Sequence, residues 1–245
     1  DIRDVRAMLE IAESLGVEVA FAANTVTLNA AKLNRSTVSQ ADCSRLRTSI
    51  LFAAPLVARL GSATLYPPGG DVIGRRRLDG HIYGLNQLGA TIGDSNAIYE
   101  FTARHRLVGR ELFLDEASVT ATEQILMAAV TARGTTTLLN AACEPHIVDL
   151  GEMLNAMGAK ISGLGSNTLV IEGVDKLHGV EFSISGDHIE VGSFLALGAA
   201  LGGELTIRGT VKRHHWMLRR VFDRFGVKLD LGAAYVHLPG ERKSV

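Results

Sequence analysis

A loop at residues 67–77 gathers the residue types that could handle an anion. It reads Pro-Pro-Gly-Gly-Asp-Val-Ile-Gly-Arg-Arg-Arg, so it joins flexible glycines to one acid, Asp71, and three adjacent arginines, Arg75, Arg76 and Arg77. A guanidinium presents a charged fork that matches phosphate or carboxylate oxygens, and a carboxyl group can deliver a proton. The loop therefore predicts an anion-binding lid. A solvated basic turn is the alternative, because glycine and proline mark turns in most proteins.

Length and composition limit the class of protein. With 245 residues, 47% of them hydrophobic and 21% charged, the chain can bury a substantial core in one large or two ordinary domains. A net charge of -1 argues against a nucleic-acid partner, which a basic domain would bind. No apolar run reaches the roughly 18 to 20 residues of a membrane span. The first residues carry charge where a signal peptide would be apolar, and they begin in a helix without an initiator methionine, so we expect a fragment.

Cysteine and histidine usage predicts neither disulfides nor a metal site. The only cysteines are Cys43 and Cys143, which form neither a Cys-x-x-Cys pair nor a disulfide framework, and this favours the reducing cytoplasm. The histidines are scattered, except that His214 and His215 are adjacent, which is not a chelating spacing on a helix.

A repeated pattern of helices and strands must position the loop. Apolar residues at helical spacing run from Ile2 to Leu15 and end at Gly16, where a left-handed helix cap is expected. Similar helices end at Gly89, Gly158 and Gly226, so this pattern of a helix that ends at a glycine recurs about every 70 residues. Each glycine precedes two short alternating segments separated by a turn, which predicts a β-hairpin.

A second type of helix, apolar on nearly every face, lies between these phrases. Its examples are residues 50–60, 125–132 and 194–201. A helix that is apolar all round belongs inside a protein, with the amphipathic helices outside. The sequence thus predicts an α/β fold of repeated βαβαββ units, three to a lobe, which need one another to bury their faces. We expect a nearly complete lobe at 1–183 with the catalytic loop, and part of a second lobe at 184–245.

Three phrases carry a resemblance to a known family. They are Leu46-Arg47-Thr48-Ser49-Ile50, the loop from Pro68 to Gly74 with Arg76, Asp79 and His81, and Glu144-Pro145-His146-Ile147-Val148-Asp149. Together they resemble the enolpyruvyl transferases over essentially the whole chain, most closely the branch that acts on UDP-N-acetylglucosamine. The sister branch that acts on shikimate 3-phosphate shares the repeat but has different loop phrases. The resemblance implies lobes built as inside-out α/β barrels, in agreement with the repeat.

The resemblance implies a reaction and its substrates. The enolpyruvyl group of phosphoenolpyruvate would move to the 3'-hydroxyl of UDP-N-acetylglucosamine with release of phosphate, the first committed step of peptidoglycan synthesis in cell-wall biogenesis. No cofactor is implied. The chemistry needs a proton for the methylene carbon of phosphoenolpyruvate and cations for its phosphate and carboxylate. The partners would be these small molecules, with no nucleic acid and no membrane.

The resemblance also assigns roles to residues. Arg47 and Arg76 match positions that hold phosphoenolpyruvate and nucleotide anions. The expected nucleotide-sugar contacts are Arg47, Arg76, Leu78, Asp79, His81, Ser118, Val119, Thr120 and Glu144. Segment 118–120 would contact the diphosphate at a helix start, although an ordinary serine or threonine cap remains an equal alternative. Glu144 and Glu190 match carboxylates near the substrate cleft or between lobes, although either could be a helix-start acid.

Asp71 stands where most members of the family have a cysteine that acts as general acid and where some have aspartate. A reference aspartate has a pKa of about 3.9, so proton donation at neutral pH would require that pKa to rise by about 3, at a cost of about 4 kcal/mol. The neighbouring arginines would lower it. Our hypothesis is that bound phosphates neutralise the arginines and that closure then desolvates Asp71. Without the cysteine, the protein should be insensitive to the epoxide fosfomycin.

Several residues depart from the family pattern. The family pattern has proline where this chain has Arg77, leucine at Gly80, glycine at Thr120, arginine at Cys143, glutamate at His146 and arginine at His188. The family's early lysine would precede Asp1, and a later aspartate and arginine would follow Val245, so we expect this chain alone to bind substrates but to turn over poorly. Two alternatives stay open: a paralogous enolpyruvyl transferase for another nucleotide, and a catalytically silent nucleotide-binding homologue.

Overall fold

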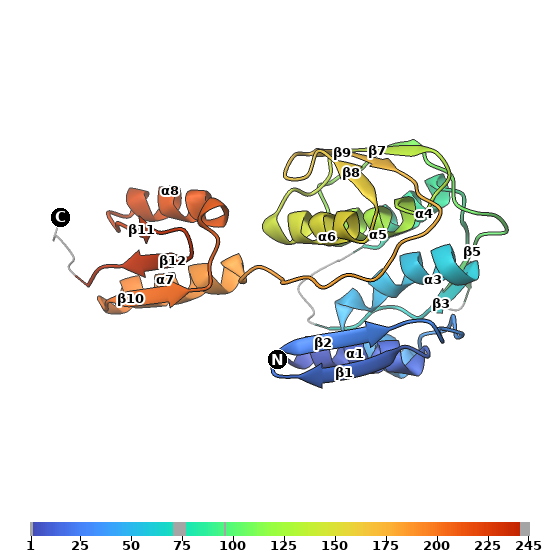
Figure 1. Ribbon diagram of the computed structural model, residues 1–245, viewed down its shortest axis with the longest axis horizontal. Helices are drawn as coiled ribbons and strands as arrows, with labels where there is room; N and C mark the ends of the chain where they lie inside the picture. The colour runs from blue at the N-terminus through green and yellow to red at the C-terminus, as the bar shows by residue number, and fades with distance from the viewer. Residues whose placement is uncertain (1, 71–76, 96, 241–245) are drawn as a thin grey trace. The chain divides into compact units, whose positions relative to one another are not determined.

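Two units divide the chain in the computed structural model, which describes residues 2–70, 77–95 and 97–240. Unit 1 comprises Asp1–Val180 and unit 2 comprises Glu181–Val245. In unit 1 the sheets lie outside helices that run through its centre (Figure 1). Its helical elements are α1 (Arg3–Ser14), α2 (Gln40–Arg45), the 3-10 helix η1 (Arg47–Phe52), α3 (Ala53–Leu60), α4 (Asp79–Gln87), α5 (Val119–Ala129) and α6 (Pro145–Ala156).

Three sheets of unit 1 follow the repeat. The strands are β1 (Glu18–Ala22), β2 (Thr25–Asn29), β3 (Ser62–Leu65), β4 (Thr91–Ser95), β5 (Ile98–Thr102), β6 (Glu111–Phe113), β7 (Thr135–Leu139), β8 (Lys160–Ser162) and β9 (Thr168–Glu172). They form the hairpin β1-β2, the sheet β3-β5-β4 and the sheet β6-β7-β9-β8. In both larger sheets the strand after the inner helix pairs antiparallel with the second strand of the hairpin. This shared order confirms the predicted repeat.

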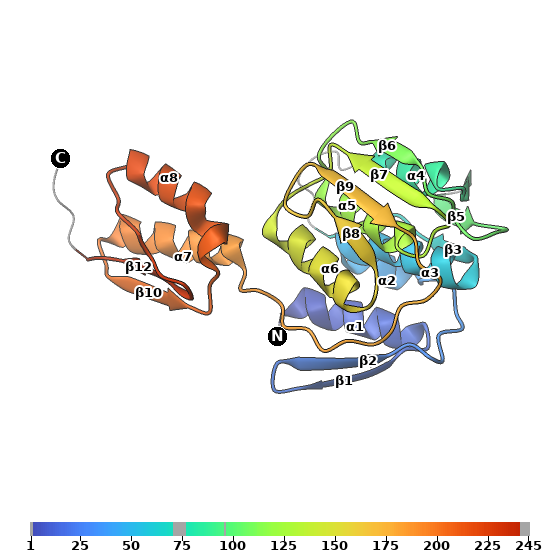
Figure 2. The ribbon, with the colours of Figure 1, turned by 45° about the horizontal axis from the view of Figure 1, so that its top comes forward.

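The leading strand of the unit differs between repeats. In the third repeat it is β6, which pairs parallel with β7. In the second repeat it shrinks to a single parallel bridge between Thr37 and Thr64. The elements of the third repeat, β6-α5-β7-α6-β8-β9, therefore give the full predicted βαβαββ unit, and Figure 2 shows α5 running under its sheet.

The core of unit 1 lies where the all-round apolar helices were predicted. Ile50, Leu56, Ile125 and Leu126 from η1, α3 and α5 are almost completely buried. Burial removes their apolar surface from water, which is the main stabilising contribution to folding. The helix-ending glycines Gly16, Gly89 and Gly158 all have positive φ, so the predicted left-handed caps are confirmed.

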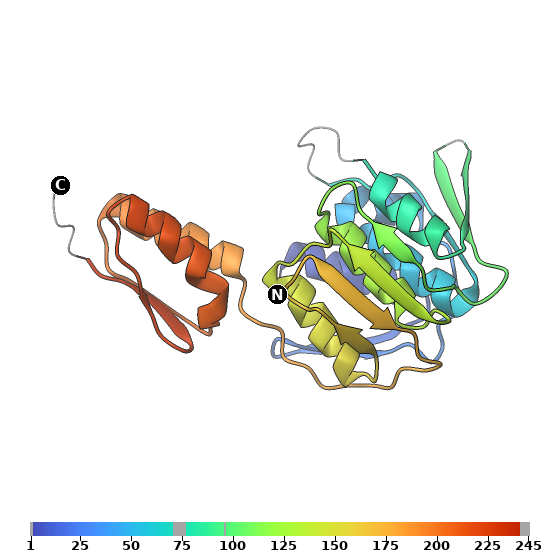
Figure 3. The same cartoon turned by 90° about the horizontal axis from the view of Figure 1, so that it is seen from above.

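Unit 2 contains one further repeat. Its elements are α7 (His188–Leu201), β10 (Leu205–Arg208), η2 (Lys212–His215), α8 (Trp216–Arg224), β11 (Asp230–Leu231) and β12 (Tyr235–Leu238), and the strand order β10-β12-β11 matches that of the earlier repeats. Figure 3 shows α8 alongside α7. A small core forms around Val191, Leu195 and Val236.

The prediction that helix 194–201 is buried is wrong for this chain. Phe194, Leu197 and Leu201 are 50, 55 and 77% exposed, whereas Leu195 is fully buried. The physical reason is that α7 packs on the strands and on α8 with one side only, since the described part of unit 2 contains just one repeat. Across the described residues, no helix is both long and apolar enough to cross a membrane.

Candidate functional site

Two chain segments meet at one edge of the sheet β6-β7-β9-β8. Because β6 and β7 are parallel, the segments that follow them leave the sheet at the same edge. Asn140 Nδ2 donates a hydrogen bond of 2.8 Å to the carbonyl of Leu114, and the Ala142 N–H donates one of 3.0 Å to Thr122 Oγ1. These bonds fix both segments against the start of α5.

Two glycines of α4 allow that helix to approach α5 closely. A Cβ at Gly84 would lie 2.4 Å from Ile125 Cγ1, and a Cβ at Gly80 would lie 3.1 Å from Ala121 Cβ. The leucine that the family pattern has at position 80 would not fit this packing without a shift. The close approach brings the start of α4 against the start of α5.

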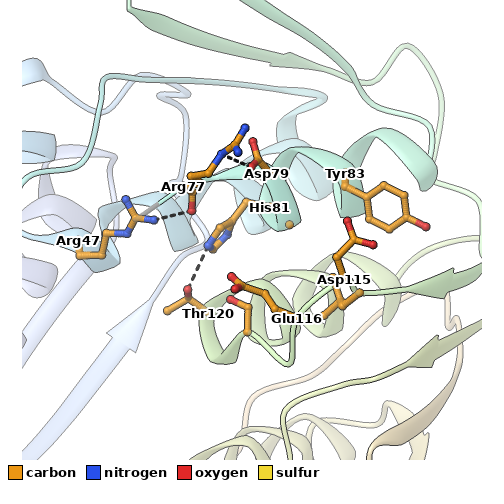
Figure 4. A pocket seen from close by; sticks show the side chains of 11 residues that line it. Arg47, Arg77, Asp79, His81, Tyr83, Asp115, Glu116 and Thr120 are labelled. Carbon is orange, nitrogen blue, oxygen red and sulfur yellow. Dashed lines mark hydrogen bonds and ion pairs between the residues drawn. The ribbon is translucent and has the colours of Figure 1, made fainter. Parts of the chain in front are cut away.

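A pocket of about 520 Å³ lies where these starts meet η1 and the segment after β6. It is lined by Arg47, Arg77, Asp79, Gly80, His81, Tyr83, Leu114, Asp115, Glu116, Ser118 and Thr120. Figure 4 shows side chains from α4, α5 and the β6–α5 segment around it. Its size is that of a small-molecule site.

Arg47 and Arg77 supply the positive charge among the described lining residues. Arg47 Nη2 donates to the carbonyl oxygen of Arg77 over 2.9 Å, and Arg77 Nε lies 2.6 Å from Asp79 Oδ2 (Figure 4). The side chains of Arg77 and Asp79 are 77 and 65% exposed. An ion pair as exposed as this contributes little to stability, so both groups can turn to a ligand at small cost.

His81 anchors the floor of the pocket. This residue is 2% exposed, with Nδ1 2.6 Å from Gln124 Oε1 and Nε2 3.0 Å from Thr120 Oγ1. Burial lowers the pKa of His81 to about 4; the hydrogen bond to Gln124 opposes this effect, and the positive charge of Arg47 adds to it. The imidazole is therefore neutral at physiological pH.

Two carboxyl groups, those of Glu123 in α5 and Glu144 before α6, interact electrostatically. Burial raises the pKa of Glu123 to about 7, and the neighbouring charge of Glu144 raises it too. Glu144 precedes α6 as its N-cap residue without a side-chain cap hydrogen bond, and its Oε2 is buried with no hydrogen-bond partner among the described residues. A large fraction of Glu123 is therefore protonated near neutral pH.

The structure brings together half of the residues predicted from the sequence. Five of them, Arg47, Asp79, His81, Ser118 and Thr120, line the pocket. Ser118 also caps α5 by accepting from the Ala121 N–H over 3.4 Å, so the cap interpretation of this residue is confirmed without excluding a ligand contact.

The other predicted residues lie elsewhere or outside the described part of the chain. Leu78 is the N-cap of α4 and Val119 the first residue of α5, and neither lines the pocket. Glu144 is the N-cap of α6 and is not a lining residue either. Asp71 and Arg76 lie outside the described residues, so their assignments stay predictions.

The acidic side of the pocket was not predicted from the sequence. Asp115 and Glu116 line it, and they follow the end of β6 at Phe113 with only Leu114 between. Their position after a parallel strand was the available signal, because such strand ends carry functional residues in α/β folds. Within the described ranges, the pocket included, no group of three or more His, Cys, Asp or Glu side chains could hold a metal ion.

Comparisons with known proteins agree with this architecture. A family model described as EPSP synthase (3-phosphoshikimate 1-carboxyvinyltransferase) matches residues 1–238. A UDP-N-acetylglucosamine 1-carboxyvinyltransferase of Treponema denticola is 47% identical over 244 residues, and one of Borreliella burgdorferi is 43% identical over 243 residues. Each alignment covers 99% of this chain but 57% of the relative. The chain thus spans little more than half the length of these relatives.

Solved structures show the same fold. The enolpyruvyl transferase NikO from Streptomyces tendae matches with a TM-score of 0.80 at 25% identity, over 97% of this chain and 57% of that one. An EPSP synthase from Acinetobacter baumannii matches with a TM-score of 0.71 at 18% identity, over 98% of this chain and 57% of that one. The predicted α/β fold of repeated units is confirmed by these likenesses.

Proposed function

The chain belongs to the EPSP synthase family of enolpyruvyl transferases, and from this premise we propose that it forms part of an enzyme that transfers the enolpyruvyl group of phosphoenolpyruvate to the 3'-hydroxyl of UDP-N-acetylglucosamine. Phosphate is released, and the product serves peptidoglycan synthesis in the cytoplasm. Relatives at 43 and 47% identity named for this reaction support the choice of acceptor. The observation that carries the proposal is the convergence of Arg47, Asp79, His81, Ser118 and Thr120 on one pocket.

Arg47 and Arg76 hold the anions in this proposal. A guanidinium binds a phosphate or carboxylate through two charge-assisted hydrogen bonds, which also fix the orientation of phosphoenolpyruvate. Asp71 delivers the proton to the methylene carbon. Arg47 Nη2 already donates to the carbonyl of Arg77, the first described residue after the segment that contains Asp71.

We assign the two units to two lobes. Residues 1–183 form the nearly complete repeat lobe with the catalytic loop, and residues 184–245 contribute to a second lobe. The division into units near residue 180 and the further repeat of unit 2 support this assignment.

A transferase that uses another nucleotide is the second candidate. Asp115 and Glu116 place carboxylates in the pocket, where they oppose a ligand rich in phosphate. Thr120 and Gly80, which depart from the family pattern, also line it. A ligand with fewer phosphates or more hydrogen-bond donors would suit such a wall.

The test is phosphate release by the full-length protein. Phosphoenolpyruvate is offered with UDP-N-acetylglucosamine, with other uridine nucleotides, or with shikimate 3-phosphate. The proposal expects release with UDP-N-acetylglucosamine, while release only with another acceptor would establish the second candidate. Nucleotide binding in a calorimeter without any release would instead identify a silent homologue.

Two variants test the residue roles. Arg47→Ala should reduce kcat/KM by about 100-fold or more, the loss typical for removal of a charged donor from an active site. The exposed Arg104→Ala serves as the control. If Asp71→Asn keeps full turnover while Arg47→Ala loses it, Asp71 is not the proton donor.

A further inference from the structure

The hydrogen bonds of His81 fix which of its ring nitrogens carries a proton. Gln124 Oε1 can only accept, and it lies 2.6 Å from Nδ1. A neutral imidazole carries one proton, so that proton is on Nδ1 and Nε2 is an acceptor. Gln124 is fully buried, and its Nε2 has no hydrogen-bond partner among the described residues, so the tautomer of His81 follows from the orientation of this amide with Oε1 towards the ring.

The tautomer of His81 in turn orients the hydroxyl of Thr120. Nε2 lies 3.0 Å from Thr120 Oγ1 and has no proton, so the single hydroxyl proton of Thr120 is donated to it (Figure 4). The lone pairs of Oγ1 are left for the pocket, which Thr120 lines. Towards a ligand, this hydroxyl is an acceptor.

Two other residues of segment 115–120 also present hydrogen-bond acceptors to the pocket. Asp115 and Glu116 present carboxylate oxygens, which only accept hydrogen bonds when ionised. The positively charged lining residues lie outside segment 115–120. Arg47 is the first residue of η1, and Arg77 lies two residues before the start of α4. This segment therefore suits a ligand surface that carries N–H or O–H groups, and the arginines suit its anionic part.

We propose that Thr120 is a specificity-determining residue that accepts a hydrogen bond from an N–H or O–H group on the nucleoside or sugar part of the ligand. His81 is its positioning residue. The inference rests on the proposed function for the identity of the ligand, and it changes the role expected for Thr120, since a hydroxyl that has already given its proton to His81 cannot donate to a diphosphate.

The first experiment measures ligand binding to Thr120 variants of the full-length protein. The probes are UDP-N-acetylglucosamine, which has ring N–H and hydroxyl donors, and inorganic diphosphate as its competitor, which has neither the nucleoside nor the sugar. Loss of one hydrogen bond should weaken binding of the nucleotide sugar about 3- to 10-fold in Thr120→Val. Thr120→Ser, which keeps the hydroxyl, should stay within about twofold of wild type, and diphosphate binding should be equal in all three.

The outcomes separate this inference from the proposed function. Equal weakening of both probes by Thr120→Val would mean that Thr120 contacts the diphosphate, and unchanged binding would mean that it contacts neither; each result overturns the inference alone. Failure of the wild type to bind UDP-N-acetylglucosamine would overturn the proposed function and this ligand assignment together.

A second measurement tests the geometry without any ligand. A long-range proton–nitrogen NMR spectrum of the imidazole distinguishes the two tautomers. We expect the Nδ1-protonated form for His81 in wild type and in Thr120→Ser. A spectrum with the proton on Nε2 would make Thr120 an available donor and would refute the inference whatever the binding data show.

Discussion

Protonation of His81 and of Glu123 should change the free energy of unfolding in opposite directions over nearly the same pH range. The pKa of His81 falls from 6.5 to about 4 on folding, so between these values the unfolded chain binds more protons and stability increases with pH. The pKa of Glu123 rises from 4.5 to about 7, so between these values the folded chain binds more protons and stability decreases with pH.

The two effects have similar size. Each unit of pKa difference corresponds to about 1.4 kcal/mol, so each group can change the free energy of unfolding by at most about 3 kcal/mol across its range. Between pH 4.5 and 6.5 the ranges overlap, and the two contributions nearly cancel in wild type. Replacing either residue should therefore reveal the pH dependence of stability that the other one contributes.

Single substitutions reveal each contribution. Glu123→Gln should lose stability on acidification from pH 6.5 to 4.5 relative to wild type, because only the His81 effect remains. His81→Gln should gain stability over the same change. The exposed Glu111→Gln and His105→Gln serve as matched controls whose pH dependence should follow that of wild type.

Urea unfolding at steps of pH measures these differences. Far-UV circular dichroism follows both units, while fluorescence of Trp216, the single tryptophan, reports unit 2 separately. An NMR titration of His81 provides its pKa directly. Parallel stability curves for wild type, Glu123→Gln and His81→Gln would refute the reasoning, because neither group would then change its proton affinity on folding.

Three further predictions concern packing and chemistry. Gly84→Ala should lower the free energy of unfolding by about 1 to 3 kcal/mol, since its Cβ would lie 2.4 Å from Ile125 Cγ1, while Gly179→Ala, with nothing within 4 Å, should change it little in the same urea experiment. In the 245-residue chain, Leu195→Ala should destabilise unit 2 by about 2 to 5 kcal/mol and the exposed Leu197→Ala by less than about 1 kcal/mol, as followed by Trp216 fluorescence. Fosfomycin should leave Asp71 unmodified in mass spectrometry, because a carboxylate is a weaker nucleophile than a thiolate, and time-dependent covalent labelling there would contradict the prediction.

The sequence alone determined the repeated architecture of this protein. Apolar residues at helical spacing, each run ending at Gly16, Gly89, Gly158 or Gly226, predict helices by local rules, and the structure contains a helix before each of these glycines. Two of the three phrases that carry the family resemblance predict Arg47, Asp79 and His81 as ligand contacts, and these residues line one pocket. These features depend on residues near one another in the chain.

Only the tertiary structure decided the polarity of the site. Asp115 and Glu116 join Arg47 in one pocket because parallel strands and the close approach of α4 to α5 bring distant segments together. The acceptor role of Thr120 depends on His81 and Gln124, which come from different helices. The exposure of α7 depends on how many repeats surround it. Hydrogen-bond direction and burial are properties of contacts, and no spacing in the sequence encodes them.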